Sequence, residues 1–289
     1  MANNKMLVDE RQRNLGSFIV GRLLPFKEKR QVGPFTFIDH MGPAEVGPGN
    51  YFDVNQHPHI GLSTLTYLFE GAIEHRDSIG SVKVVHPGDV GFMTAGKAVT
   101  HTERTPAPKR DGSSHIIHGY QIWVALPKEL EEMEPRFNFY PASSLPKWTE
   151  NNCEIVLVAG EAFGKQSPLQ GYSPLFMVDI RAMEDTHLDL GKKIKGEVAF
   201  VIVRGSIELE GERVEQGQML VSRTREMCTM EIKKGTRILL FGGEPLPEER
   251  FLLWNFVSSS RDRLKEARRL WQEKRFPQVP GDQTYIPFP

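Results

Sequence analysis

The sequence has very little cysteine. Cys153 and Cys228 are the two cysteines among 289 residues, and they lie far apart and outside any C-x-x-C motif. A disulfide framework and a zinc ribbon built on paired cysteines are therefore excluded, and a reducing compartment fits best. Residues 1–11 also lack the apolar core of a secretory signal. We therefore expect a cytoplasmic protein.

Long apolar runs and an excess of charge of one sign are also missing. No run approaches the roughly 20 apolar residues that a membrane-spanning helix needs. The 36 Lys and Arg residues are balanced by 37 Asp and Glu residues, for a formal net charge of −1. A nucleic-acid-binding protein usually carries a basic excess. We expect neither a membrane nor a nucleic acid as a direct partner.

Glycine and proline are abundant and mark the ends of short apolar segments. The 26 Gly and 20 Pro residues separate runs that are rich in Val, Ile, Leu, Phe and Thr. This spacing predicts an all-β protein, a sandwich or barrel of many short strands. The expected strands lie at 17–24, 35–39, 63–70, 72–77, 81–85, 89–93, 115–126 and from 154 onward to about 242.

One segment in the middle of the chain has a different composition. Residues 127–150 are rich in Pro and Glu and show no regular apolar pattern. This segment is the best candidate for a linker between two domains. We therefore expect an N-terminal domain over 1–130, a linker over 131–153 and a C-terminal domain over 154–289.

A single long helix is expected near the end of the chain. Between residues 259 and 274 the residues Leu264, Ala267, Leu270 and Trp271 recur at helical spacing, with charged residues between them. Serines at 258–260 can cap its first turn, and prolines at 277 and 280 end it. A Pro-rich tail follows.

The two halves of the chain carry a similar pattern. Segments 67–75 and 85–93 read as a strand, a glycine turn and a hairpin, and segments 200–209 and 214–221 repeat this order. Such an echo indicates two copies of one β-barrel unit. Chance similarity between short hairpins is the alternative.

Two short motifs carry the chemistry, His57-Pro58-His59 and His101-Thr102-Glu103. Side chains at i and i+2 of a strand point to the same face, so two such strands side by side can enclose a divalent metal ion. Three imidazoles and a carboxylate suit Fe(II), Mn, Ni, Cu or Zn. Four protein ligands also leave positions open for water, O2 or substrate, unlike a closed structural zinc site.

The other histidines carry weaker signals, since a histidine in a β-rich chain is usually a partly buried polar residue. We expect a surface position, or one beside the ligands, for His75 and His86, and local hydrogen bonds for His115 and His118. His40 lies in what reads as a compact turn that could line a cavity. In the second half, His187 and Asp189 resemble the remnant of an H-x-H pair, and the late strand at 227–231 has no H-x-E. We expect one metal ion per chain.

These motifs resemble the pirin family, double-domain members of the cupin superfamily. The similar segments lie in order at 33–43, 57–61, 67–71, 87–90, 93–97, 101–103, 121–127 and 242–246. The resemblance implies two tandem cupin (jelly-roll-like) β-barrels followed by the short C-terminal helix and tail. It also implies one metal ion, usually iron, in the N-terminal barrel, held by His57, His59, His101 and Glu103. General cupins often take a glutamate a few residues after H-x-H, but residues 60–64 contain no acid, which favours Glu103 as the carboxylate ligand.

The family resemblance implies two kinds of function. Some pirins resemble quercetin 2,3-dioxygenases, which open a flavonol ring with O2 and release carbon monoxide. For this chain we therefore expect an Fe(II)-type dioxygenase that acts on a flavonol-like enol, with Glu103 as the general base. Phe35, Phe37, Met93 and Trp123 are candidates for an apolar slot, or else ordinary barrel core.

The alternative is a non-catalytic, metal-dependent redox-sensing or protein-binding module, similar to a transcription cofactor, with a protein as its partner. A purely structural metal is a third hypothesis.

Overall fold

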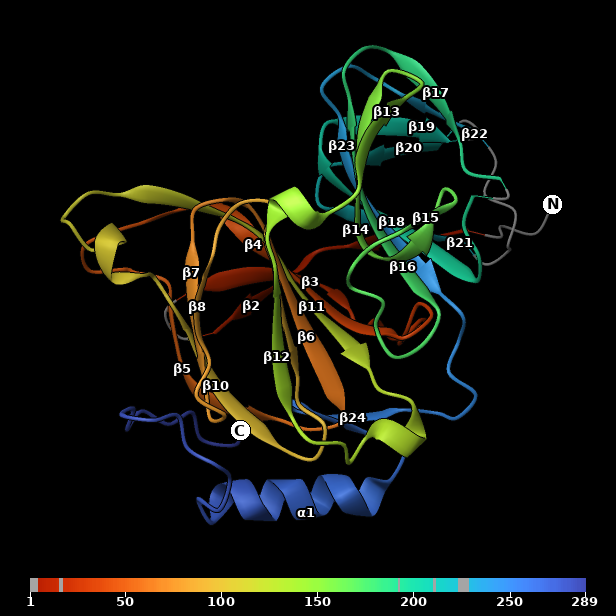
Figure 1. The fold of residues 1–289 in the computed structure, drawn as a ribbon. Coiled ribbons are helices and arrows are strands. Elements are labelled where there is room, and N and C mark those ends of the chain that lie inside the picture. Colours follow the sequence, from red (N-terminus) through yellow and green to blue (C-terminus); the bar gives the residue numbers. More distant parts are fainter. Residues whose placement is uncertain (1–4, 16–17, 192, 210–211, 223–228) are drawn as a thin grey trace. The chain divides into compact units, whose positions relative to one another are not determined.

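The structure is a computed structural model that describes residues 5–15, 18–191, 193–209, 212–222 and 229–289 (Figure 1). The chain divides into two compact units. The N-terminal barrel comprises residues 12–21, 37–142 and 247–289, and the C-terminal barrel comprises the described parts of 1–11, 22–36 and 143–246. The expected all-β fold of two tandem barrels with a short C-terminal helix is confirmed.

The N-terminal barrel is built from two sheets of antiparallel strands that enclose an apolar core. The larger sheet has the order β12 (Arg136–Tyr140), β9 (Val90–Thr94), β6 (Leu62–Glu70), β11 (His115–Ala125), β4 (Phe35–Val46), β3 (Ile19–Leu24) and β2 (Arg11–Asn14). The smaller sheet has the order β5 (Asp53–His59), β10 (Val99–Arg104), β7 (Ile73–Asp77) and β8 (Val82–Val85). The core between them includes Met41, Phe52, Val54, Leu68 and Ile117.

The C-terminal barrel repeats this plan. Its larger sheet has the order β1 (Lys5–Asp9), β21 (Gln218–Ser222), β18 (Glu197–Arg204), β23 (Arg237–Gly243), β16 (Leu175–Ala182), β14 (Cys153–Ala162) and β13 (Lys147–Glu150), and β15 (Lys165–Gln166) also pairs with β14. Its smaller sheet has the order β17 (Thr186–Asp189), β22 (Thr229–Ile232), β19 (Ser206–Leu209) and β20 (Glu212–Glu215).

The strand pairing explains the echo in the sequence. In the N-terminal barrel β6 pairs with β9, and the chain between them forms the hairpin β7–β8. In the C-terminal barrel β18 pairs with β21, and the chain between them forms the hairpin β19–β20. Strand β17 therefore corresponds by topology to β5, the strand that carries the H-x-H motif.

The structure groups the two ends of the chain differently from the expected division at residues 130 and 153. Strand β1 pairs with β21 in the C-terminal barrel, and residues 247–289 belong to the N-terminal barrel. The expected linker contains strand β12, which pairs with β9, and strand β13, which pairs with β14. In β12 the apolar Phe137 alternates with polar neighbours and packs on Met93 and Val99, a pattern of period two within the Pro-rich segment.

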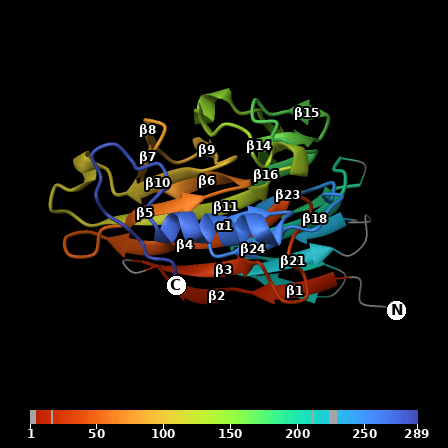
Figure 2. The same cartoon turned by 90° about the horizontal axis from the view of Figure 1, so that it is seen from below.

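The expected helix is α1 (Arg261–Gln272), which lies on the outside of the N-terminal barrel (Figures 1 and 2). Ser260 caps it by accepting a hydrogen bond from the Arg263 N–H. Leu264, Ala267 and Trp271 form its buried face and pack on Phe256 and Phe276. The described residues also include short 3-10 helices at Ala107–Lys109, Lys128–Leu130 and Ala142–Ser144. Within the described residues, no helix is long and apolar enough to span a membrane.

Replacing Leu264 with Ala tests the assignment of α1 to the N-terminal barrel. Leu264 is 4% exposed, so its truncation should lower the free energy of unfolding by about 2–5 kcal/mol. The loss should appear as faster hydrogen exchange in β6 and β11, with β16 and β18 unchanged. Lys265→Ala, one residue further on the exposed face, should stay within about 0.5 kcal/mol of the wild type. Faster exchange confined to β16 and β18 would contradict the assignment.

Candidate metal centre

A β-bulge in β5 turns the H-x-H motif toward the barrel interior. His101 of β10 pairs with His57, and Glu103, two residues later, pairs with Val54, so β5 holds one extra residue between these pairs. Val54 lies in the apolar core, and without the extra residue His57 would point to the opposite face from Val54. The bulge therefore lets Val54, His57 and His59 all face inward, as bulges beside functional sites often do.

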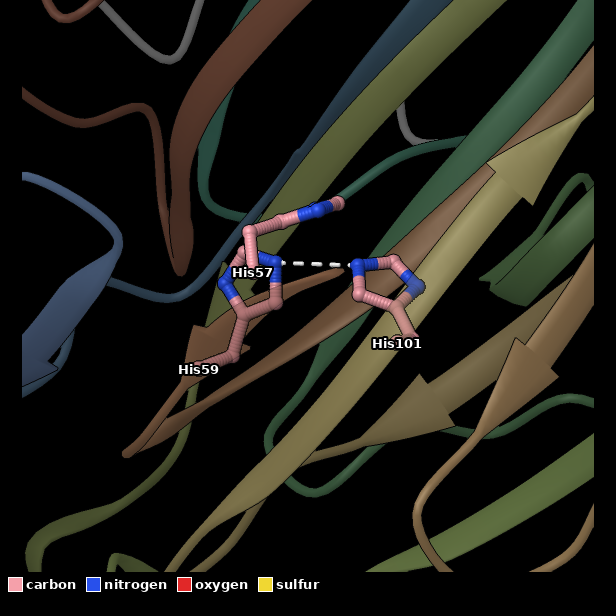
Figure 3. Close-up of side chains that lie close together, drawn as sticks. All are labelled: His57, His59 and His101. Carbon is pink, nitrogen blue, oxygen red and sulfur yellow. Dashed lines mark hydrogen bonds between the residues drawn. The ribbon is translucent and has the colours of Figure 1, made fainter. Parts of the chain in front are cut away.

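Three histidine side chains meet inside the barrel (Figure 3). Each of His57, His59 and His101 offers a ring nitrogen, and these three atoms lie within 4.8 Å of one another. The Nε2 atoms of His59 and His101 are 3.1 Å apart. The three residues are 8%, 1% and 0% exposed, respectively. The predicted histidines of both motifs are thus brought together at one point.

Backbone carbonyls fix the tautomers of the two histidines on β5. His57 Nδ1 lies 2.8 Å from the carbonyl oxygen of Asn55, and His59 Nδ1 lies 3.1 Å from that of Asn255. A carbonyl oxygen can only accept a hydrogen bond, so each Nδ1 carries the proton. Each Nε2 therefore presents a lone pair, which is the form that binds a metal ion.

A chain of hydrogen bonds fixes the tautomer of His101. Asp77 Oδ1 accepts hydrogen bonds from the N–H groups of Ile79 and Ser81, and Asp77 Oδ2 lies 3.0 Å from His75 Nε2. The Asp77 carboxylate accepts a hydrogen bond from His75 Nε2–H, so the Nδ1 atom of His75 keeps a lone pair. That atom lies 3.3 Å from His101 Nδ1 and accepts a hydrogen bond from His101 Nδ1–H. His101 Nε2 is thereby left with a lone pair as well.

The site suits a cation. Burial lowers the pKa of His57 to about 4 and lowers the pKa values of His59 and His101 well below the ordinary 6.5, so all three rings are neutral at pH 7. Two lone pairs 3.1 Å apart repel each other, and a divalent ion between them removes that repulsion. Neutral imidazoles need lose no proton on binding. The donor set therefore fits a divalent transition metal.

Glu103 lies beside this cluster, on the side of His101. A carboxylate oxygen of Glu103 forms a second group with His75 and His101, again with ligand atoms within 4.8 Å of one another. Its Oε1 accepts hydrogen bonds from Gln121 Nε2 (2.6 Å) and Thr66 Oγ1 (3.3 Å). Burial raises the pKa of Glu103 above its ordinary value, although these two hydrogen bonds oppose that effect. His101 thus belongs to both groups, and His75, for which the sequence predicted a position at the surface or beside the ligands, is buried beside His101.

One of the four aromatic and apolar candidates contacts the histidines, and a second stacks on it. The Trp123 ring meets His59 edge-to-face, with centroids 5.0 Å apart, and Phe37 stacks on Trp123 at 3.8 Å. Met93 packs with Ala95, Val99 and Phe137. Phe35 is fully buried against Phe241 within the C-terminal barrel and is core there.

The remaining histidines lie elsewhere. His40 is in strand β4, where a compact turn was expected, because residues 35–46 form one continuous strand; its Nε2 lies 3.0 Å from that of His118. His86 is exposed, and His115 begins β11.

In the C-terminal barrel, His187 and Asp189 are exposed on β17, and Leu188 between them is buried. Met227 and Cys228 lie outside the described residues.

The stability of the metal-free protein should fall in mild acid. Between pH 6.5 and 4 the unfolded chain binds a proton at His57 that the native protein does not, so the free energy of unfolding decreases as the pH drops through this range. For His57 alone the loss is about 3 kcal/mol, because one pKa unit is worth about 1.4 kcal/mol. His59 and His101 act in the same direction, whereas Glu103, with its raised pKa, acts in the opposite one.

Urea unfolding in the presence of a chelator at pH 7.5, 6.5, 5.5 and 4.5 measures this dependence. A His57→Gln variant should show a shallower fall. Equal stability of the wild type from pH 7.5 to 5 would contradict the buried neutral histidines.

Comparison with known proteins agrees with this fold. A family model described as Pirin matches residues 17–124, and one described as Pirin C-terminal cupin domain matches residues 177–277. A pirin-like protein from Caulobacter vibrioides is 43% identical over 288 residues, which cover 98% of this chain and 99% of that protein.

Solved structures share the architecture. A quercetin 2,3-dioxygenase from Acinetobacter baumannii superposes with a TM-score of 0.91 at 35% identity, covering 99% of this chain and 95% of that one. A bacterial pirin from Escherichia coli, solved in complex with nickel(II), shares the fold with a TM-score of 0.66 at 20% identity, covering 84% and 100%. With a pirin model matched in each half and a relative that is 43% identical over nearly the whole chain, the chain belongs to the pirin family.

Proposed function

We propose that the N-terminal barrel holds one divalent transition metal ion through His57, His59, His101 and Glu103, and that the loaded protein is a dioxygenase for a flavonol-like enol such as quercetin. The observation that carries the proposal is the convergence of three imidazoles whose Nε2 lone pairs are set by hydrogen bonds at Nδ1. The similarity to a quercetin 2,3-dioxygenase at 35% identity supports the choice of substrate class.

The ion would supply Lewis acidity toward the enolate oxygen and the capacity for one-electron exchange with O2. The family resemblance favours Fe(II), and a donor set of three nitrogens and one oxygen also accepts Mn, Ni, Cu or Zn.

Glu103 is the group in this site that can take a proton from the substrate. Its raised pKa brings the carboxylate closer to the working range of a general base near neutral pH. Gln121 and Thr66 both donate hydrogen bonds to Oε1, and a carboxylate oxygen of Glu103 lies within 4.8 Å of ring nitrogens of His75 and His101. Trp123, stacked on Phe37, provides an apolar surface beside His59 for an aromatic ring.

The alternative function is a redox-sensing or protein-binding module without turnover. The burial of His59 and His101, at 1% and 0% exposed, favours it, because an ion held there is shielded from solvent and from bulky substrates. A sensor needs only a change in shape or surface between oxidation states of its metal. Oxygen consumption in the presence of substrate separates the two functions.

Removing ligands should affect metal retention in a graded way. His101→Ala should abolish or strongly weaken binding because His101 belongs to both donor groups. His75→Ala should weaken binding about 10- to 100-fold, since His75 orients His101. His86→Ala, an exposed histidine, is the matched control and should bind like the wild type.

Metal analysis of protein purified without chelator should give about one ion per chain. Full occupancy in a His57→Ala, His101→Ala double variant would overturn the ligand assignment. A stoichiometry near two that drops on mutating His187 would place a second site in the C-terminal barrel.

Loaded protein should convert quercetin with release of carbon monoxide. The assay loads the protein anaerobically with Fe(II), Mn, Ni or Cu, then adds quercetin and O2 and detects carbon monoxide. Glu103→Gln should reduce turnover more than it reduces metal content, because the amide cannot accept the substrate proton. Glu70→Gln, an exposed carboxylate at the end of β6, should leave both unchanged. If no metal form exceeds the metal-free control, the sensing or binding function is the better account.

A further inference from the structure

The strand that carries His57 and His59 lies at the edge of its sheet. Strand β5 pairs with β10 on one side only, and the other edge of such a strand leaves backbone groups that need partners. In this barrel the C-terminal part of the chain supplies them. Val257 N–H donates to the Ile60 carbonyl (3.2 Å), and Ile60 forms a parallel bridge with Phe256. One residue earlier, the Asn255 carbonyl accepts the hydrogen bond from His59 Nδ1.

Gln56 makes the largest share of these contacts. It is fully buried although it lies in the bulge next to His57. Its Nε2 donates to the carbonyls of Asp282 (2.9 Å) and Thr284 (3.0 Å), and its Oε1 accepts from Val279 N–H (2.8 Å). Its backbone N–H donates to Thr284 Oγ1 (3.2 Å), and its carbonyl accepts from Ile286 N–H (2.9 Å).

We call residues 279–286 the C-terminal latch. A glutamine amide offers two N–H donors and one carbonyl acceptor, and the latch presents two carbonyls and one N–H to match them. The closest partners of the amide are backbone groups, so the match depends mainly on the path of the latch; Nε2 also makes a longer contact of 3.4 Å with the Asp282 side chain. The latch therefore holds the residue that forms the bulge, and the bulge directs His57 inward.

The latch is itself fixed on its far side. Trp271 Nε1 donates to the Ile286 carbonyl (2.9 Å), and the Tyr285 ring stacks on Trp271 with centroids 4.5 Å apart. Arg104, the last residue of β10 and the one directly after Glu103, forms an ion pair with Asp282 (2.7 Å). The latch thus joins helix α1, β10 and β5 (Figure 1).

We propose that the C-terminal latch is a positioning element of the metal centre, and that Gln56 is the positioning residue through which it holds His57 and His59. The proposal rests on the proposed metal site. Releasing the latch frees the bulge, so the two ligands on β5 lose their fixed geometry while the rest of the barrel stays folded. The latch then sets metal affinity from outside the barrel.

Gln56→Glu tests the proposal. The new carboxylate has the same size, but it lacks both N–H donors and faces two carbonyl oxygens. Thr284→Ala is a milder variant that removes one acceptor for the Gln56 N–H. Gln278→Glu makes the same chemical change at an exposed position just before the latch and serves as the control. The measurements are the dissociation constant for Ni(II), by competition with a chelator, and hydrogen exchange of residues 53–60 in metal-free protein.

The proposal predicts faster exchange over 53–60 and a 10- to 100-fold weaker affinity for Ni(II) in Gln56→Glu. Thr284→Ala should change both in the same direction by less, and Gln278→Glu should match the wild type. Faster exchange with unchanged affinity for Ni(II), or unchanged exchange in both variants, would overturn the proposal. If Gln56→Glu does not fold, the result for Thr284→Ala is decisive. If the wild type binds no Ni(II), Fe(II) or Mn(II), the proposed metal site fails, and the exchange measurement still decides whether the latch holds β5.

Discussion

The extra residue in β5 is the constraint on which the rest of the site depends. Without the bulge, strand alternation would turn His57 and His59 to the face opposite Val54, away from the core. The topologically corresponding strand β17 pairs with β22 without a register shift, and there His187 is exposed with Leu188 in the core. One residue thus separates a strand that presents ligands to the interior from one that presents them to solvent.

Burying three neutral imidazoles has an energetic cost that the surrounding hydrogen bonds offset. The carbonyls of Asn55 and Asn255 accept hydrogen bonds from Nδ1–H of His57 and His59. His75, itself hydrogen-bonded to Asp77, accepts one from Nδ1–H of His101. The remaining lone pairs face one another, which is unfavourable until a cation lies between them. Binding of the proposed ion would be coupled to folding, because an ion that binds the native state alone stabilises it by mass action.

The sequence predicts the clustered histidines and the helix because both depend on local spacing. His57-x-His59 and His101-x-Glu103 follow the period of a strand, and Leu264 and Trp271 follow that of a helix. The duplication is predicted for the same reason, as hairpins are local. Even the signal for His75 was present, since His75 and Asp77 are two residues apart on β7 and face the same way.

Contacts between distant segments could not be predicted in this way. The bulge depends on the pairing of β5 with β10, and the Asn255 and Gln56 contacts join residues about 200 positions apart. For the same reason, residues 247–289 were expected in the C-terminal barrel, which directly precedes them in the sequence, although they belong to the N-terminal barrel. Phe35 is a further example, because an apolar side chain fits the core of either barrel. Only the path of the chain brings it into contact with Phe241.

Three imidazoles should bind one ion through Nε2, with their Nδ1 protons held by the protein. Nitrogen-15 NMR of histidine side chains in the Zn(II)-loaded protein tests it most directly, since Zn(II) is diamagnetic and suits this donor set. The account predicts metal-bound Nε2 and protonated Nδ1 for His57, His59 and His101, with His75 not bound to the metal. Binding of His101 through Nδ1, or His75 among the ligands, would contradict it.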